Sequence, residues 1–168
     1  NSSNNLLSGT PTNSDVGTHS VQIKALDNNA GEVIQSFTIE VSNSNDAPVV
    51  INPLQDQNVL EDKTFAISIP TDTFTDIDSG DELTLSATFS NGDALPSSWI
   101  NFNPTSGTLN GTALNEHVGS HSIRVTATDK ANIAAFDEII LTVLNSNDAP
   151  TFSSSPSSTA TLGSQYSY

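Results

Sequence analysis

The sequence predicts an all-β protein made of tandem antiparallel β-sandwich modules, one of them complete and two of them partial. Three observations lead to this fold class. Short segments with alternating apolar residues lie between clusters of Gly, Pro, Asn and Asp, no longer stretch has a helical pattern, and a long repeat runs through the chain. Alternation is typical of strands that bury one face, and about seven such strands per hundred residues indicate a two-sheet sandwich.

The internal repeat has a period of 102 residues. Residues 9–48 align with residues 111–150 without a gap, and 16 of the 40 aligned positions are identical. The hexapeptide NSNDAP occurs at Asn43–Pro48 and again at Asn145–Pro150. A period this long indicates whole globular modules in series, because solenoid repeats are only about 20–50 residues long.

The phase of the repeat predicts the domain organisation. We expect the second half of a module at 1–46, a complete sandwich at 47–148, and the first strands of a following module at 149–168. A module of about one hundred residues can bury its own core. Because the chain breaks inside modules at both ends, we expect it to be a piece of a longer protein.

Four segments of the middle module carry the strand pattern. Every second residue faces one side: Phe65, Ile67 and Ile69 in TFAISI; Leu83, Leu85, Ala87 and Phe89 in LTLSATF; His121, Ile123, Val125 and Ala127 in HSIRVTATD; and Ile139, Leu141 and Val143 in IILTV. Side chains alternate between the two faces of a strand. We therefore expect these residues to face the core.

The charge balance excludes several classes of partner. The chain has 4 basic and 19 acidic residues, which gives a net charge of −15. Binding to nucleic acid or to anionic membranes needs Lys and Arg, so neither is expected. No apolar run approaches the ~20 residues of a membrane span, and the absence of Cys excludes disulfides. Abundant Asn, Ser, Thr and Asp with few Lys is typical of an extracellular or cell-surface protein.

The densest acidic stretch is DTFTDIDSGDE at residues 72–82. It holds five carboxylates and no base: Asp72, Asp76, Asp78, Asp81 and Glu82. Crowded carboxylates repel one another and need a counter-charge, which Ca²⁺ can supply because it takes six to eight oxygen ligands. The stretch lacks the ligand spacing of an EF-hand. Asp and Gly also form ordinary turns, so an ion-free polar loop stays open as an interpretation.

Several stretches together resemble a known family. FTDIDSGDELTLSA, HVGSHSIRVTATD and NSNDAP resemble cadherin-like repeats, in particular the dystroglycan-type, bacterial-style Ig-like modules, and LPSSWINFNPTSGTLNGTA resembles the same branch. The resemblance covers the middle module and both flanking fragments. It implies Ca²⁺ ions between consecutive modules, held by the base of one module, the linker, and the top of the next.

The resemblance implies a ligand set for each of two junctions. The first would use linker residues Asn43, Asn45 and Asp46 with Asp76, Asp78 and Asp129 of the middle module. The second would use Glu61 and Glu116 with linker residues Asn145, Asn147 and Asp148. The sequence departs from the family at Ser14, which replaces a ligand Glu, at Leu162, which stands opposite Glu61, and at Ala47 and Ala149, which replace a linker Asn. The two junctions therefore need not bind equal numbers of ions.

The linker also admits a plainer interpretation, since Asn, Asp and Pro are ordinary linker residues. With calcium, the chain would be a stiff extracellular rod in an adhesin or large membrane-associated surface protein. Its partners would be neighbouring repeats and like modules in trans. A carbohydrate-binding accessory module and a filament subunit joined by strand complementation are the alternatives. No nucleophile, base or closed metal site can be assembled, so the chain is not expected to be an enzyme.

Four aromatic side chains bear on these alternatives. Trp99 could offer a face for stacking on sugars, but a single indole in a small sandwich more often fills the core. His19 and His121 occupy equivalent strand positions, where we expect core imidazoles bonded to the backbone. His117 lies in the preceding loop and is expected to be solvated.

Overall fold

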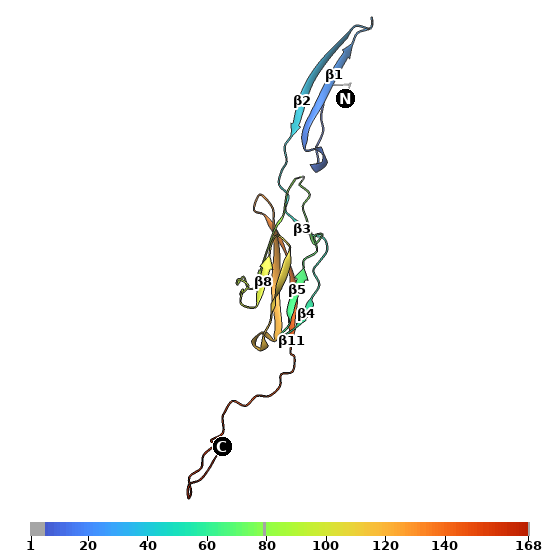
Figure 1. Cartoon of the computed structure of the whole chain (residues 1–168). Coiled ribbons are helices and arrows are strands. Elements are labelled where there is room, and N and C mark those ends of the chain that lie inside the picture. The colour runs from blue at the N-terminus through green and yellow to red at the C-terminus, as the bar shows by residue number, and fades with distance from the viewer. Residues whose placement is uncertain (1–5, 79, 168) are drawn as a thin grey trace.

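The computed structural model describes residues 6–78 and 80–167 and shows an elongated molecule (Figure 1). A two-stranded hairpin stands at one end, a β-sandwich lies in the middle, and an extended segment leads away from the other end. The only helices of the described residues are two short 3-10 turns, η1 (Asn13–Asp15) and η2 (Asn115–His117). Neither turn has the length and hydrophobicity that crossing a membrane requires. The all-β fold class is confirmed.

The strands fall into a hairpin and a sandwich. The hairpin consists of β1 (Gly17–Leu26) and β2 (Glu32–Val41). The sandwich contains β3 (Val49–Val50), β4 (Gln57–Leu60), β5 (Thr64–Ser68), β6 (Phe74–Thr75), β7 (Thr84–Phe89), β8 (Ile100–Asn103), β9 (Thr108–Thr112), β10 (Gly119–Thr128) and β11 (Ala134–Leu144).

Two principal sheets form the sandwich. One has the strand order β4-β11-β10-β7 and the other the order β5-β9-β8, while β3 and β6 pair at the end nearest the hairpin. The described strands pair antiparallel except for β4 and β11, which are parallel, with Gln57 opposite Leu141. Both strands run away from the hairpin, because each begins after a segment at the hairpin end, β3 for β4 and the loop after β10 for β11 (Figure 1).

The core lies between the two sheets, and the predicted alternation is confirmed in β5, β7, β10 and β11. The buried apolar residues are Ile69, Phe74, Trp99, Ile100, Leu109, Ala113, Ile123, Val125, Ala127, Ile139, Leu141 and Val143. Each large side chain among them contributes roughly 1.5–3 kcal/mol by leaving water. This core holds β7, β10 and β11 in place, and the acidic loops emerge at the ends of these strands.

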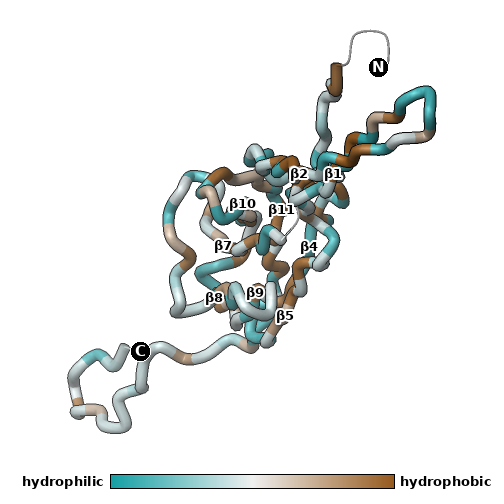
Figure 2. Tube along the Cα trace, turned by 90° about the horizontal axis from the view of Figure 1, so that it is seen from above, coloured by the Kyte–Doolittle hydropathy of each residue, from teal (hydrophilic) through white to brown (hydrophobic). Residues whose placement is uncertain are grey.

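The hairpin repeats the two central strands of the sandwich. Gly17 pairs with Val41 in the hairpin as Gly119 pairs with Val143 in the sandwich, and each pair is displaced by the 102-residue period. The face that β10 and β11 bury is exposed in the hairpin, where Ile23 and Ile39 are 49% and 39% exposed. Figure 2 shows hydrophobic residues along the hairpin as well as within the sandwich. No second sheet covers this face within the described residues.

Limited proteolysis tests the predicted module boundaries. Proteases cut exposed, unpaired backbone most readily. We expect a stable fragment close to 47–148, with early cuts before residue 47 and after residue 148, identified by intact mass. A stable product that ends near residue 95, between β7 and β8, would contradict the predicted domain organisation.

Candidate metal centre

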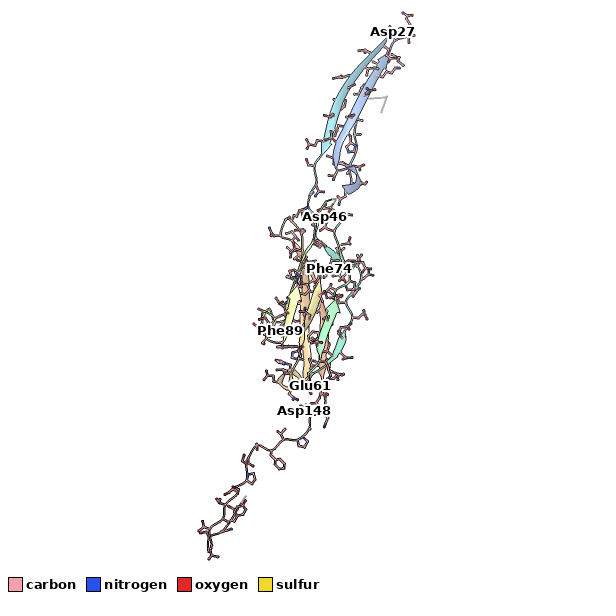
Figure 3. All side chains as sticks on the ribbon, viewed as in Figure 1. Asp27, Asp46, Glu61, Phe74, Phe89 and Asp148 are labelled. Atoms are coloured by element: carbon pink, nitrogen blue, oxygen red, sulfur yellow. The ribbon has the colours of Figure 1, made fainter. Side chains whose placement is uncertain are left out.

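The sandwich has two acidic poles. We call the pole that faces β1 and β2 the hairpin pole, and the opposite pole, from which residues 145–167 lead away, the tail pole. Figure 3 shows Asp46 between the hairpin and the sandwich, and Glu61 together with Asp148 at the tail pole. The predicted ligands of the two junctions therefore lie at opposite ends of the sandwich.

The linker bonds directly to the hairpin pole. The backbone N–H of Asp46 donates to Asp78 Oδ2 at 2.8 Å, and Asn45 Nδ2 donates to Asp129 Oδ2 at 2.9 Å. Asp78 and Asp129 are only 6% and 5% exposed. Two of the three predicted carboxylates of the sandwich at this junction, Asp78 and Asp129, thus contact the predicted linker residues.

Two loops bring these carboxylates together. One loop, residues 76–82, connects β6 to β7, and the other, residues 129–133, connects β10 to β11. Because Thr84 pairs with Thr128, both loops emerge at the same end of the sheet. Asp129 Oδ1 accepts a hydrogen bond from Ile133 N at 2.7 Å, and this side-chain turn closes the second loop.

Three carboxylates of the hairpin pole converge. Asp76, Asp81 and Asp129 each place an oxygen so that the three atoms lie within 4.8 Å of one another. The resemblance did not assign Asp81 as a ligand. The sequence feature that could have indicated Asp81 is its place in the acidic stretch, three residues after Asp78. In the structure a turn brings these two residues together, and Asp81 N donates to Asp78 O at 3.2 Å.

The donor set of this pole fits a hard cation. Asp76 Oδ2 and Asp78 Oδ1 are buried and have no hydrogen-bond partner. Leaving a charged oxygen buried and unpaired is costly, and like charges this close repel. Carboxylate and amide oxygens are the ligands that Ca²⁺ prefers. The residues present are therefore compatible with a calcium ion.

The electrostatics keep Asp129 ionised at neutral pH. Burial by itself would raise the pKa of Asp129, but hydrogen bonds from the Asn45 amide and from the backbone of Ile133 and Ala131 outweigh it and hold this pKa below its usual value. An ionised carboxylate is the form that binds a cation.

The tail pole contains a buried carboxylate of its own. Glu61 follows β4 and is completely buried; its Oε1 accepts from Ser146 N at 2.7 Å, whereas its Oε2 has no partner. Asn115 Nδ2 donates to Asp148 Oδ2 at 2.6 Å. Glu116 is exposed in η2, with Oε1 3.7 Å from His117 Nε2. Glu61 and η2 thus both contact the second linker.

The linker asparagines have different roles. Asn45 and Asn147 donate through Nδ2 to the carbonyl oxygens of the residues that follow them, at 2.8 and 3.1 Å, so their amide oxygens are the atoms that could bind a cation. Asn43 and Asn145 are exposed in their linkers. Among the described residues, the hydrogen bonds to the buried carboxylates come from other linker residues, Asn45, Asp46 and Ser146.

The aromatic residues argue against a sugar-stacking platform. Trp99 is buried, as predicted for a core residue. His121 Nε2 is bonded to the backbone oxygen of His117 at 2.7 Å, also as predicted. The prediction of a solvated His117 is wrong, because its ring stacks on Trp99 with 4.5 Å between the centroids. His19 makes the equivalent contact to Asp15 O but is exposed, since no second sheet covers the described hairpin.

The fold and the two poles define a tandem Ig-like sandwich segment with acidic junctions. The chain matches the He_PIG family, described as "Putative Ig domain", over residues 1–42 and 47–144, and it belongs to that family. Both the hairpin and the sandwich therefore fall within matched repeats.

Solved structures show the same fold. The chain is similar to extracellular cadherin domains 1–5 of protocadherin gamma B2 (TM-score 0.58, 23% identity, 83% of this chain and 29% of that chain). It is also similar to domains 1–4 of protocadherin gamma B7 (TM-score 0.56, 22% identity, 81% and 34%). An endo-fucoidan hydrolase of glycoside hydrolase family 107 matches with a TM-score of 0.47 at 23% identity (83% and 20%). This chain thus spans between a fifth and about a third of these three chains.

The family match and the two protocadherin structures confirm the Ig/cadherin-like module, and at such identities the structures concern the fold alone. No curated protein matches the sequence.

Proposed function

We propose that this chain is a calcium-binding segment of dystroglycan-type cadherin-like repeats, which forms a stiff extracellular rod and serves as a spacer or adhesive element of a cell-surface protein. One observation carries the proposal. The linker bonds to two buried carboxylates of the sandwich, Asp78 and Asp129, at the pole where buried carboxylate oxygens of Asp76 and Asp78 lack partners.

The residues of the hairpin pole would hold the ion between linker and sandwich. Asp76, Asp81 and Asp129 would contribute converging oxygens, and Asp78 would contribute its unpaired oxygen. Bound Ca²⁺ supplies the positive charge that offsets the repulsion among these groups. Asn45 and Asp46 bring the linker to the same place, so the bending of the linker against the sandwich would be restricted.

The tail pole would supply the other half of the next junction. At this pole Glu61 contacts the second linker, and Asp148 is part of that linker. Glu116 lies on the neighbouring turn η2. A following repeat would add the loops that correspond to 76–82 and 129–133. Neighbouring repeats are therefore the first partners of this chain.

The alternative functions have weaker support. Burial of Trp99 removes the aromatic face that polysaccharide binding would use. Strand complementation is favoured by the exposed hairpin face and by two highly exposed apolar residues beyond the sandwich, Phe152 and Leu162. We expect no enzymatic activity.

Inter-repeat distance distributions test the rod. The chain has no cysteine, so spin labels can be placed at Ser36→Cys on β2 and Ser86→Cys on β7, both of which are exposed. We expect the distribution of label distances to narrow on going from EDTA to millimolar Ca²⁺, because the ion ties the linker to the sandwich. Magnesium at the same concentration is the control, since its smaller octahedral shell suits such a site poorly.

Two results would contradict the proposal: identical distributions in EDTA and Ca²⁺, or no heat of binding in a calcium titration. Binding to a glycan array that survives EDTA would favour the carbohydrate-binding alternative.

A further inference from the structure

The turn η1 presents one side chain to the first linker. Asp15 Oδ2 accepts a hydrogen bond from Thr12 N at 2.8 Å and closes the turn, while His19 Nε2 is bonded to Asp15 O at 2.6 Å and ties the turn to β1. Asn13, the first residue of η1, then donates through Nδ2 to Asp46 Oδ2 at 2.8 Å. The family resemblance assigns no role to Asn13.

The turn η2 makes the same three contacts at the second linker, 102 residues later. His117 Nδ1 accepts from Leu114 N at 3.0 Å, His121 Nε2 is bonded to His117 O at 2.7 Å, and Asn115 Nδ2 donates to Asp148 Oδ2 at 2.6 Å. The side chain that closes the turn has changed from Asp to His, yet the Asn–Asp pair is the same.

The two copies of the contact lie in different surroundings. The side chain of His117 in η2 stacks on Trp99 of the sandwich core, whereas η1 precedes an open hairpin whose apolar face is exposed. The same contact therefore forms with and without a core beside it. We conclude that the Asn–Asp pair belongs to the repeat itself and does not depend on one packing environment.

Asp46 joins the two repeats at the first linker. Its side chain accepts from Asn13 of the preceding repeat, and its backbone N–H donates to Asp78 of the sandwich. The contact with Asn13 engages Oδ2, so Oδ1 of the same carboxylate is the oxygen that can face a cation. A carboxylate already held in one rotamer loses less conformational entropy when it becomes a ligand.

We propose that Asn13 and Asn115 are positioning residues for the linker carboxylates Asp46 and Asp148. We call the two Asn–Asp pairs the linker clasps. Each clasp orients a carboxylate toward the junction and also ties the linker to the repeat before it, with or without an ion. The first effect rests on the proposed function, and the second effect does not.

The variant Asn13→Ala tests the first clasp in the full chain. We expect it to bind Ca²⁺ roughly three- to tenfold more weakly in a calorimetric titration, the range that loss of one exposed hydrogen bond of ordinary strength produces. We also expect the distance distribution between labels at positions 36 and 86 to broaden in EDTA. The control is Asn91→Ala, which removes two exposed bonds in the turn after β7, from Asn91 Nδ2 to Asp93 Oδ2 (2.7 Å) and from Asp93 N to Asn91 Oδ1 (3.0 Å). The control should change neither measurement.

A second variant tests the clasp even if Asn13→Ala does not fold. Asn13→Asp has nearly the same size but sets a carboxylate beside Asp46, so its distribution should broaden in EDTA through repulsion and narrow again with Ca²⁺. The proposal of a clasp would be overturned if Asn13→Ala had the same Ca²⁺ affinity as the unaltered chain and the same distance distribution in EDTA. If the unaltered chain binds no Ca²⁺, the proposed function fails, and the EDTA distributions alone decide whether the clasp exists.

Discussion

The double variant Asp76→Asn, Asp78→Asn is expected to be more stable than the unaltered chain in EDTA and to gain much less from calcium. Each residue has a buried oxygen without a partner, and Asp76 also has oxygens of Asp81 and Asp129 within 4.8 Å. Without an ion, the variant loses this repulsion and the cost of two buried charges, an effect of about 1 kcal/mol or more. An Asn at position 78 can still accept the bond from Asp46 N.

Calcium should reduce or remove this difference in stability. Extracellular sites commonly have Kd values near 10⁻⁴–10⁻³ M, so millimolar Ca²⁺ stabilises by on the order of 1 kcal/mol per site. For a sandwich of this size that corresponds to a rise in Tm of about 4–8 °C. Thermal unfolding followed by circular dichroism in EDTA and in Ca²⁺ measures both effects, and the rise in Tm should be largely absent in the variant.

A charge-matched control separates coordination from general screening. Asp72→Asn with Glu82→Gln removes two charges from the same acidic stretch, but both residues are exposed and lie outside the converging set. This control should retain the full calcium response. An equal loss of response in the control and in the test variant would mean that Ca²⁺ acts only by screening the net negative charge.

The strands of the sandwich were predictable because alternation records which face a residue occupies. Ile123 and Val125 alternate with polar neighbours and are fully buried. Val21 and Ile23 alternate in the same way in the hairpin, yet they are not buried, because alternation does not say whether a second sheet covers the face. The parallel pairing of β4 was not predictable from its four residues, since the path of the chain through the opposite sheet decides strand direction.

The candidate site was only partly predictable for a related reason. Asp78 precedes the strand pattern LTLSATF and Asp129 ends the pattern HSIRVTATD, so their place at one end of an antiparallel sheet could be expected from the sequence. The convergence of Asp81 depends on the turn within its loop, and the role of Asn13 depends on a contact across 33 residues. One signal for Asn13 was present: the identical Asn115 stands 102 residues later.

Gly111→Ala is expected to destabilise the sandwich by about 3 kcal/mol, at the upper end of the usual cost of overpacking. A Cβ atom at Gly111 would lie 1.9 Å from Trp99 O and 3.0 Å from Ile100 Cα. These are backbone atoms, so no side-chain rotation relieves the overlap. Gly111 also pairs with Phe65 of β5 on one side and with Ile100 of β8 on the other. The strand therefore cannot shift without breaking hydrogen bonds of the sheet.

The internal repeat offers a matched control for this substitution. Gly9 aligns with Gly111 at the 102-residue period, but a Cβ atom at Gly9 would have nothing within 4 Å. In this chain, Gly9→Ala should change the free energy of unfolding by less than about 0.5 kcal/mol, as surface substitutions do. Urea unfolding of both variants followed by Trp99 fluorescence measures the difference directly. Equal stabilities of the two variants would contradict this prediction. They would mean that the backbone at Trp99 lies farther from position 111 than this structure shows, so that a Cβ atom there meets no overlap.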